Sequence, residues 1–243
     1  MFEYVCRGFA RAPFMKTIGL LGGMSWESTQ LYYRLINEET RRKLGGLHSA
    51  RVVLVSLDFQ EIETLQNRGD WTTAVDLLAD AARRVENAGA DFLLICTNTM
   101  HKVADEVAAA TTIPLLHIAD ATAGCIVDSG ITTVGLLGTR FTMEQDFYSA
   151  RLKERGLNVL TPPADGRELV HRVIYEELCL GTVRPESRVA FLAIIDDLVQ
   201  RGAQAVVEGC TEIGMLVNEQ HTDVTLFDTT RIHAEKAVAV ALE

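Results

Sequence analysis

The 243-residue chain lacks several features that mark familiar classes of protein. No run of about eighteen apolar residues occurs, so no transmembrane helix is expected. There is no basic run either, and the net charge of −10 argues against nucleic acid and anionic membranes as partners. The five cysteines include no CxxC pair, which favours reduced thiols over a disulfide framework. We therefore expect a cytoplasmic protein whose partner is a small molecule.

Common catalytic motifs are also missing. The chain contains no GxSxG nucleophile elbow, no HExxH pair and no cluster of cysteines and histidines, so no metal is expected. The glycine-rich stretch GLLGGMSWEST (19–29) matches neither common phosphate-loop pattern. The start of the helix that follows it could hold a carboxylate, or the stretch could be a tight turn with a helix N-cap.

Short apolar runs alternate with amphipathic stretches along the chain. These runs are continuously hydrophobic, as is typical of strands covered on both faces. The spacing of Ala74, Leu78, Ala81 and Val85 predicts a helix with one face in the core. We therefore expect an α/β fold with parallel sheets. The predicted strands are 16–21, 51–57, 91–96, 113–118, 131–137, 157–161, 204–208 and 224–227.

An internal repeat divides the chain into two similar halves. TIGLLG (17–22) recurs as TVGLLG (133–138), GADFLLICT (89–97) resembles GAQAVVEGC (202–210), and IPLLHI (113–118) resembles VTLFDT (224–229). Such an ordered set predicts two parallel-sheet domains related by a pseudo-twofold axis, with the active site in the cleft between them. We expect domains at 15–122 and 123–227, with the helix at about 228–243 packing on the first. Residues 1–14, upstream of Met15, are expected to form a disordered extension.

The middle match of the repeat aligns Thr97 with Cys210. Ligands in α/β folds bind at the carboxyl ends of strands, so both side chains are expected to face the cleft. Cys96 aligns with Gly209 and points the other way, because neighbouring strand residues alternate in direction. A helix starting after Cys210 would lower the pKa of its thiol, unless the residue is a small buried hydrophobe. In the loop 138–142, Thr139 and Thr142 either form a second anion cradle or cap a helix.

Four motifs in this order, GLLGGMSWEST, ICTNTMH, LLGTRFTM and EGCTEIGML, resemble the cofactor-independent aspartate/glutamate racemase family over residues 15–243. The resemblance implies a homodimer with no pyridoxal phosphate or other cofactor. It also implies a mechanism with two bases, normally two cysteines, on opposite faces of Cα. Here Cys210 matches the second cysteine, whereas Thr97 replaces the first.

The resemblance also implies which residues hold the substrate. The lysine that aspartate racemases carry after a helix corresponds here to Cys179, which leaves room for substrates other than aspartate. Gln60 is a weaker candidate for a substrate contact than the others. The residues expected to bind the carboxylates and the amino group are Met24, Gln60, Asn98, Thr99, Thr139, Thr142, Thr211 and Glu212.

The function expected from these residues is racemisation of aspartate or glutamate. Cys210 would remove the Cα proton, and reprotonation would come from the side of Thr97. A threonine hydroxyl is a far weaker acid than a thiol of pKa about 8.5, so turnover is expected to be asymmetric. In the family that the motifs resemble, the second cysteine acts on the L-enantiomer, so the resemblance implies that the L-enantiomer is favoured. No enzyme can bias the overall equilibrium, so this asymmetry must lie in KM and kcat together. The alternatives are a one-cysteine decarboxylase of the same superfamily and a non-catalytic amino-acid-binding protein.

Overall fold

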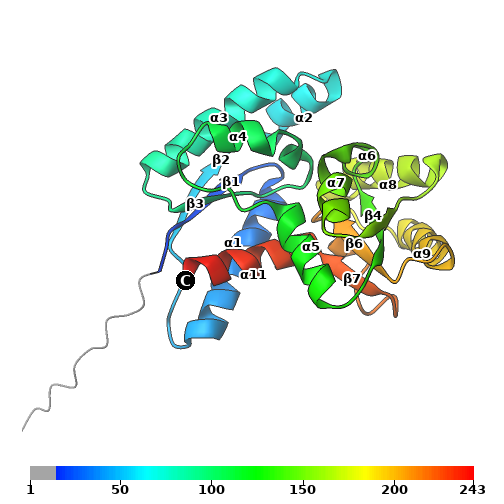
Figure 1. Cartoon of the computed structure of the whole chain (residues 1–243). Coiled ribbons are helices and arrows are strands. Elements are labelled where there is room, and N and C mark those ends of the chain that lie inside the picture. Colours follow the sequence, from blue (N-terminus) through cyan, green and yellow to red (C-terminus); the bar gives the residue numbers. More distant parts are fainter. Residues whose placement is uncertain (1–14) are drawn as a thin grey trace, which may run out of the picture.

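The computed structural model describes residues 15–243, so the expected extension 1–14 lies outside the described residues. Two parallel sheets stand side by side in this part of the chain (Figure 1). The fold class expected from the sequence, α/β with parallel sheets, is confirmed. The first sheet has the order β2-β1-β3, with β1 Ile18–Gly22, β2 Val52–Ser56 and β3 Phe92–Ile95. The second has the order β5-β4-β6-β7, with β4 Thr133–Gly138, β5 Asn158–Leu160, β6 Ala205–Gly209 and β7 Thr225–Asp228.

Helices connect the strands and cover both faces of each sheet. Those of the first half are α1 Trp26–Leu44, α2 Phe59–Arg68, α3 Trp71–Asn87, the 3-10 turn η1 Thr99–Val103, and α4 Ala104–Ala109. The connecting helix α5 spans Ile118–Asp128. Those of the second half are α6 Arg140–Glu144, α7 Asp146–Glu154, α8 Ala164–Glu176, the 3-10 turn η2 Leu178–Leu180, α9 Pro185–Gln200 and α10 Ile213–Leu216; the chain ends with α11 Thr229–Ala241.

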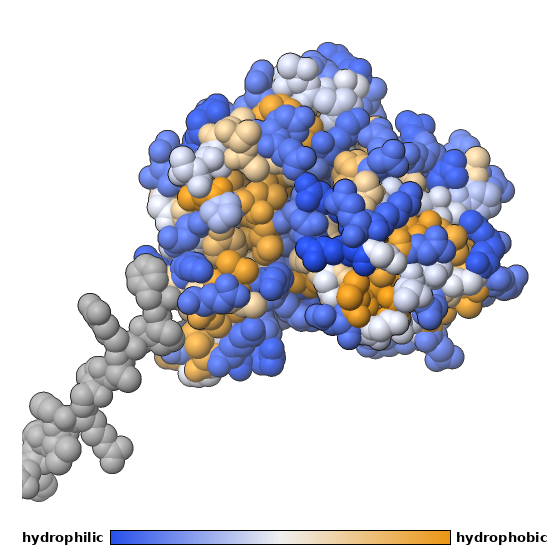
Figure 2. All heavy atoms as spheres, in the orientation of Figure 1, coloured by the Kyte–Doolittle hydropathy of each residue, from blue (hydrophilic) through white to orange (hydrophobic). Residues whose placement is uncertain are grey.

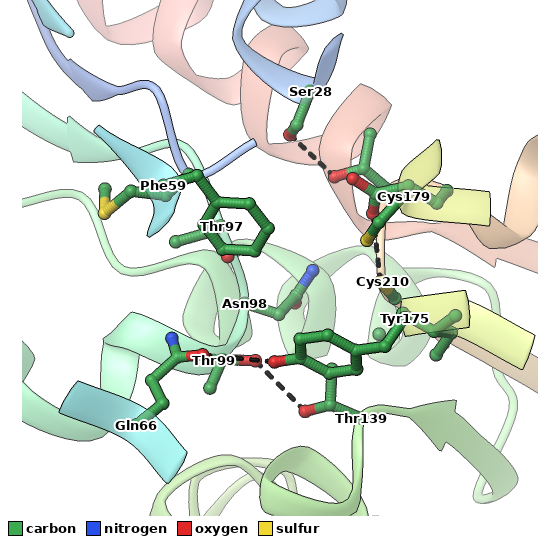
Figure 3. Close-up of a pocket in the computed structure, with 15 residues that line it drawn as sticks. Ser28, Phe59, Gln66, Thr97, Asn98, Thr99, Thr139, Tyr175, Cys179 and Cys210 are labelled. Carbon is green, nitrogen blue, oxygen red and sulfur yellow. Dashed lines mark hydrogen bonds between the residues drawn. The ribbon is translucent and has the colours of Figure 1, made fainter. Parts of the chain in front are cut away.

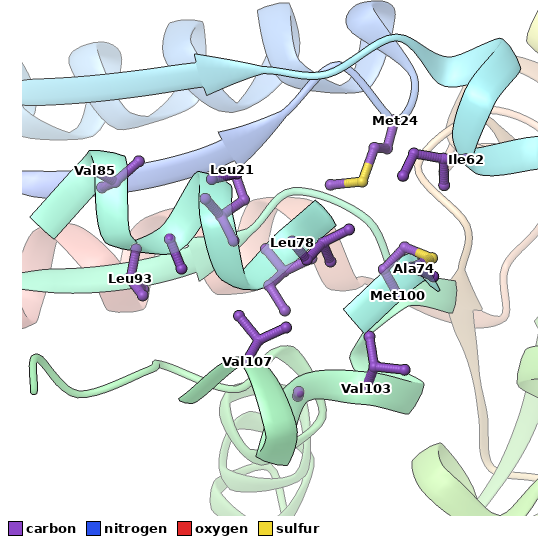
Figure 4. Close-up of a cluster of buried hydrophobic side chains, with 14 of the residues drawn as sticks. Leu21, Met24, Ile62, Ala74, Leu78, Val85, Leu93, Met100, Val103 and Val107 are labelled. Atoms are coloured by element: carbon purple, nitrogen blue, oxygen red, sulfur yellow. The ribbon is translucent and has the colours of Figure 1, made fainter. Parts of the chain in front are cut away.

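Strands β1 and β3 of the first sheet are buried on both faces, which explains their continuously apolar sequences, whereas the edge strand β2 is partly exposed. Successive residues of β1 enter different clusters: Leu21 packs with Leu78 and Leu93 under α3 (Figure 4), whereas Leu20 packs with α1 and α11 on the other face. Gly19 allows α3 to approach the sheet closely, since a Cβ there would lie 2.4 Å from a methyl carbon of Val85. The two clusters form the core of the first half.

The internal repeat appears as corresponding strands in the two sheets. The central strands β1 and β4 carry the first repeated motif, and their neighbours β3 and β6 carry the second. The third match is only partial. The segment 113–118 is not the strand that the sequence predicted, because only Leu115 pairs with Leu93, in an isolated bridge. Pro114 has no N–H to donate, and the chain turns into α5 directly after His117, so the pairing cannot extend.

Two helices join the halves. The helix α5 runs through the boundary expected at 122 and 123, because its apolar side packs against the second sheet from its first turn onward. The helix α11 follows β7 of the second sheet but crosses back to the first half, where Ala237 and Val238 pack with Tyr32 of α1. Figure 1 shows α11 lying between α1 and α5. The end of the chain therefore completes the core of its beginning.

The surface shown in Figure 2 is mostly hydrophilic, with separate hydrophobic patches over both halves. The exposed large apolar side chains are spread over helices, a strand and loops, as with Trp26 of α1, Leu54 of β2 and Val189 of α9. In the part of the chain that the structure describes, no helix has both the length and the hydropathy needed to cross a bilayer.

Candidate active site

A cavity lies between the two halves, where the carboxyl ends of their strands meet (Figure 3). Its volume is about 30 Å³, and the first half and the second half both contribute to its wall. The sequence-predicted residues that line it are Met24, Thr97, Asn98, Thr99, Thr139, Cys210, Thr211 and Glu212. Phe59, Gln66, Ile174, Tyr175 and Cys179 also line it, and of these the sequence analysis had singled out Cys179 alone.

The two expected catalytic residues reach the cavity from equivalent strand ends. Thr97 lies just beyond β3 and is partly exposed, whereas Cys210 directly follows β6 and is 9% exposed. Cys96, next to Thr97, is fully buried among Tyr32 and the alanines of α11, so its side chain points away from the cavity. This burial raises the pKa of the Cys96 thiol, and the residue belongs to the core.

The thiol of Cys210 donates a hydrogen bond of 3.0 Å to Oε2 of Glu212. Burial, followed by the charge of Glu212, raises the pKa of Cys210 well above its usual value. The expectation that a helix N-terminus lowers this pKa was wrong. The helix α10 has only four residues, Ile213–Leu216, so its dipole is small against the cost of burying a thiolate.

The carboxylate of Glu212 is held by both halves of the protein. Its Oε1 accepts a hydrogen bond of 2.8 Å from the Ser25 hydroxyl, while Oε2 faces the Cys210 thiol. Ser25 is also the N-cap of α1, since its side chain accepts from the backbone N–H of Ser28. Glu212 is therefore placed to accept the proton of Cys210.

The two glycine-containing loops are turns that end in N-caps. Gly23 has φ +86°, and a Cβ there would lie 2.1 Å from the Leu57 carbonyl oxygen, so glycine serves a close backbone approach. Thr139 caps α6, and its side chain accepts from the backbone N–H of Thr142. Thr142 is fully buried beneath Thr139 and does not line the cavity. Each loop still presents one hydroxyl to the cavity, from Ser28 and from Thr139.

Hydroxyl groups meet across the cleft in two places. The Thr99 and Thr139 hydroxyls are 3.0 Å apart, and those of Ser28 and Thr211 are 2.9 Å apart. In both pairs one residue comes from each half, because the two β-strand ends face each other. The Ser28 hydroxyl donates its proton to the Cys96 carbonyl, at 3.0 Å, so only Thr211 of that pair can turn a donor toward a carboxylate. In the other pair, one of the two threonine hydroxyls can do so.

Asn98 offers the cavity an acceptor that has no partner. Its Nδ2 donates to the hydroxyl of Thr229, and that hydroxyl donates in turn to the Glu208 carbonyl, which fixes the orientation of the amide. Oδ1 of Asn98 is then buried without a hydrogen bond among the described residues. A buried acceptor of this kind is costly unless a donor reaches it, which suits the ammonium group of a ligand.

Gln60 lies outside the cavity. It is exposed on α2, where Nε2 contacts Glu63 and Thr64. The side of α2 that faces inward carries Phe59, Ile62 and Gln66, at helical spacings of three and four. Gln66 is a polar residue on an otherwise apolar side of α2, and this pattern in the sequence could have identified it as a residue of the site.

Gln66 closes the cavity together with Tyr175 of the second half. Gln66 is 4% exposed, and its Oε1 accepts a hydrogen bond of 3.1 Å from the Tyr175 hydroxyl (Figure 3). A volume of 30 Å³ holds only about two water molecules. An amino acid needs more room, so we expect side chains of the cavity wall, such as Gln66 and Tyr175, to move when it binds. Burial raises the pKa of Tyr175 and of Cys179, and both are protonated at neutral pH.

The chain is similar to known proteins over nearly its whole length. The model of a family described as Asp/Glu/Hydantoin racemase matches residues 21–237. A crystal structure of a candidate Asp/Glu racemase from Yersinia pestis is 55% identical, covers 94% of this chain and 100% of that one, and has a TM-score of 0.88. The structure of an aspartate racemase homologue from Pyrococcus horikoshii OT3 is 34% identical, covers 94% and 100%, and has a TM-score of 0.82. The broad specificity amino-acid racemase RacX of Bacillus subtilis (strain 168) is 23% identical over 93% of this chain and 98% of its own.

Proposed function

This chain belongs to the Asp/Glu/Hydantoin racemase family, and we propose that it racemises aspartate or glutamate without pyridoxal phosphate, with Cys210 and Thr97 on opposite faces of Cα. The family that the four motifs resemble is thereby confirmed. The observation that carries the proposal is that Thr97 and Cys210 line one cavity from the equivalent strand ends of the two halves.

The cavity suits a zwitterion with a second carboxylate. The free Oδ1 of Asn98 can accept from the substrate ammonium. The Thr99–Thr139 hydroxyl pair and the Thr211 hydroxyl can each donate to a carboxylate. Cys179 stands where aspartate racemases carry a lysine, so no cation from that position selects one chain length. We infer that both aspartate and glutamate are accepted.

Glu212 supports the role of Cys210 as the base. A thiol must lose its proton before it can take one from Cα, and the raised pKa keeps Cys210 protonated at rest. The substrate ammonium would favour the negative charge on the sulfur, while Oε2 of Glu212, 3.0 Å away, accepts the thiol proton. The thiolate formed in this way then removes the Cα proton of the L-enantiomer.

Thr97 makes the two faces of the reaction unequal. Its hydroxyl can donate a proton to a carbanion that is already formed, but it cannot serve as a resting base. The buried imidazole of His101 bonds to the Thr97 backbone carbonyl, 2.8 Å from Nδ1, and not to the hydroxyl. We therefore propose that proton removal from the L-enantiomer by Cys210 is fast and that inversion through Thr97 is slow.

Exchange of the α-hydrogen in D₂O tests this function. Proton NMR follows loss of the Cα signal, and chiral chromatography follows inversion, for both enantiomers of aspartate and glutamate. We expect L-substrates to exchange faster than they invert, and we expect Thr97→Cys to raise the inversion rate. The Haldane relation holds kcat/KM equal in the two directions, so only kcat and KM taken separately, or exchange against inversion, reveal the asymmetry.

Two variants make the outcome decisive. Cys210→Ala should abolish exchange, whereas Gln60→Ala, on the exposed side of α2, should leave it unchanged. Exchange that survives Cys210→Ala refutes the assignment of the base. Binding of aspartate or glutamate with no exchange at all would support the amino-acid-binding alternative, and release of CO₂ from substituted malonates would support the decarboxylase.

We also propose that the chain is a homodimer, as the resemblance implies, and that it is cytoplasmic, as its lack of paired cysteines suggests. Size-exclusion chromatography with light scattering gives the mass directly; a single species at the 26.8 kDa of one chain would contradict the dimer.

A further inference from the structure

A second and larger cavity lies in the second half, away from the substrate pocket. Its volume is about 540 Å³, and it lies beside the carboxyl ends of β6 and β7 and the first turn of α11. No residue lines both this cavity and the substrate pocket. A volume in this range is typical of a site for a small molecule.

The wall of this cavity contains a carboxyl group with an unsatisfied oxygen. Glu208 of β6 is 5% exposed, and its Oε1 has no hydrogen-bond partner within residues 15–243. Burial raises the pKa of this carboxyl to about 8, helped by the charges of Asp228 and Glu219 in the same wall. Because χ3 of glutamate rotates with a low barrier, either oxygen can face the cavity. Burying an unpaired carboxyl is costly, and a donor from a ligand would remove this cost.

The charges around the cavity indicate what kind of donor fits. Three acidic side chains line it, those of Glu208, Glu219 and Asp228, against one basic side chain, that of Arg231. In the described part of the chain Arg231 belongs to no ion pair, so its guanidinium is free to hold a carboxylate. A ligand that complements this wall carries one carboxylate and more than one cationic group.

We propose that this cavity is a second binding site, for an α-amino acid with a cationic side chain, of the lysine, ornithine or arginine kind. The carboxylate of the ligand bonds to Arg231, and its ammonium groups bond to Glu208 and to the acids beside it. Leu226, Phe227 and Ile232 supply apolar walls for the methylene chain between the charges. The site is separate from the pocket of the proposed racemisation and does not depend on that function.

The site is connected to the catalytic residues through the backbone. Glu208 precedes Cys210 by two residues, and its carbonyl accepts a hydrogen bond of 2.8 Å from the Thr229 hydroxyl. That same hydroxyl accepts from the catalytic-pocket residue Asn98, at 3.1 Å. These hydrogen bonds link the backbone of Glu208 to Asn98 of the substrate pocket.

Cys125 provides a local readout, because it is exposed and lies in the wall of this cavity. The full-length protein is treated with iodoacetamide at pH 8.5, and mass spectrometry follows alkylation of the Cys125 peptide separately from the other cysteines. The probes are L-lysine, L-norleucine, which lacks the side-chain ammonium, and cadaverine, which lacks the carboxylate. We expect L-lysine to protect Cys125 at concentrations about tenfold lower than either analogue.

Variants link protection to the proposed contacts. Glu208→Gln and Arg231→Gln should each raise the lysine concentration needed for half protection by about tenfold. Glu61→Gln, on the exposed side of α2 in the other half, is the matched control and should change nothing. The proposal is overturned if L-lysine leaves Cys125 unprotected, if norleucine or cadaverine protects as well as lysine, or if both cavity variants behave like wild type. None of these outcomes bears on exchange of the α-hydrogen, so the two proposals fail separately.

Discussion

Replacing Glu208 by glutamine should make the protein more stable at alkaline pH and leave it unchanged at acid pH. Burial raises the pKa of this carboxyl from 4.5 to about 8. The folded state therefore keeps the proton over a range in which the unfolded chain has lost it. A carboxyl whose pKa is raised in the folded state lowers the free energy of unfolding very little below pH 4.5, and lowers it increasingly as the pH rises toward 8. At about 1.36 kcal/mol for each pKa unit, the difference between 8 and 4.5 corresponds to a full cost of about 5 kcal/mol above pH 8.

Urea unfolding followed by circular dichroism at pH 5, 7 and 9 measures this cost. Glutamine is neutral at every pH and similar in shape to the protonated acid, so Glu208→Gln should lie within about 1 kcal/mol of wild type at pH 5. It should exceed wild type by several kcal/mol at pH 9. Glu61→Gln is the control, because Glu61 is exposed on α2 in the other half, away from Glu208. If wild type and Glu208→Gln lose stability in parallel between pH 5 and 9, the carboxyl is not held protonated by the fold and the reasoning is wrong.

Three further predictions concern the substrate pocket. Glu212→Gln removes the acceptor of the Cys210 thiol proton, so we expect α-hydrogen exchange, followed by NMR, to slow by about a hundredfold while calorimetry shows that the substrate still binds. An unchanged exchange rate would exclude Glu212 as the acceptor. Tyr175→Phe removes the hydrogen bond to Gln66 across the cavity wall, so stopped-flow fluorescence should show faster substrate association than in wild type. Equal association rates would show that this bond does not limit access. Ser25→Ala removes both the N-cap of α1 and a hydrogen bond to Glu212, and urea titrations should show a free energy of unfolding lower by about 1 to 3 kcal/mol. A decrease below about 0.3 kcal/mol would contradict both roles.

The fold was predictable from the sequence because its signals are local. The sequence FLLI of β3 is apolar at every position, because both faces of this strand are covered. In α3, by contrast, apolar residues recur every three or four positions. The repeat aligned Thr97 with Cys210, and strand alternation separated Thr97 from Cys96. The failure at 113–118 is also physical. The segment has the composition of a strand, but Pro114 and the early start of α5 leave only Leu115 to pair.

The details of the site depended on packing between distant segments. Gln60 and Gln66 are six residues apart on one helix, and only the phase of α2, which starts after the N-cap Asp58, decides which one faces the cleft. The pKa of Cys210 depends on burial in a wall to which Tyr175 of α8 contributes, 35 residues earlier in the sequence. Glu208 stands within a strand and resembles an apolar position by its context. Nothing in the sequence near it marks the cavity, which forms only when β7 and α11 are in place.

The path of α11 has a consequence for the order in which the chain can fold during synthesis. Ala234, Ala237, Val238 and Ala241 cover one face of the first sheet, yet they belong to a helix that is synthesised after every strand of the second sheet. Until then Ile18, Leu20 and Tyr32 have only the neighbouring side chains of α1 as cover on that side, and a nascent first half leaves them partly exposed. The second sheet, by contrast, can pack against α5, α8 and α9 before the chain ends. The half that is made first is therefore the half that is completed last.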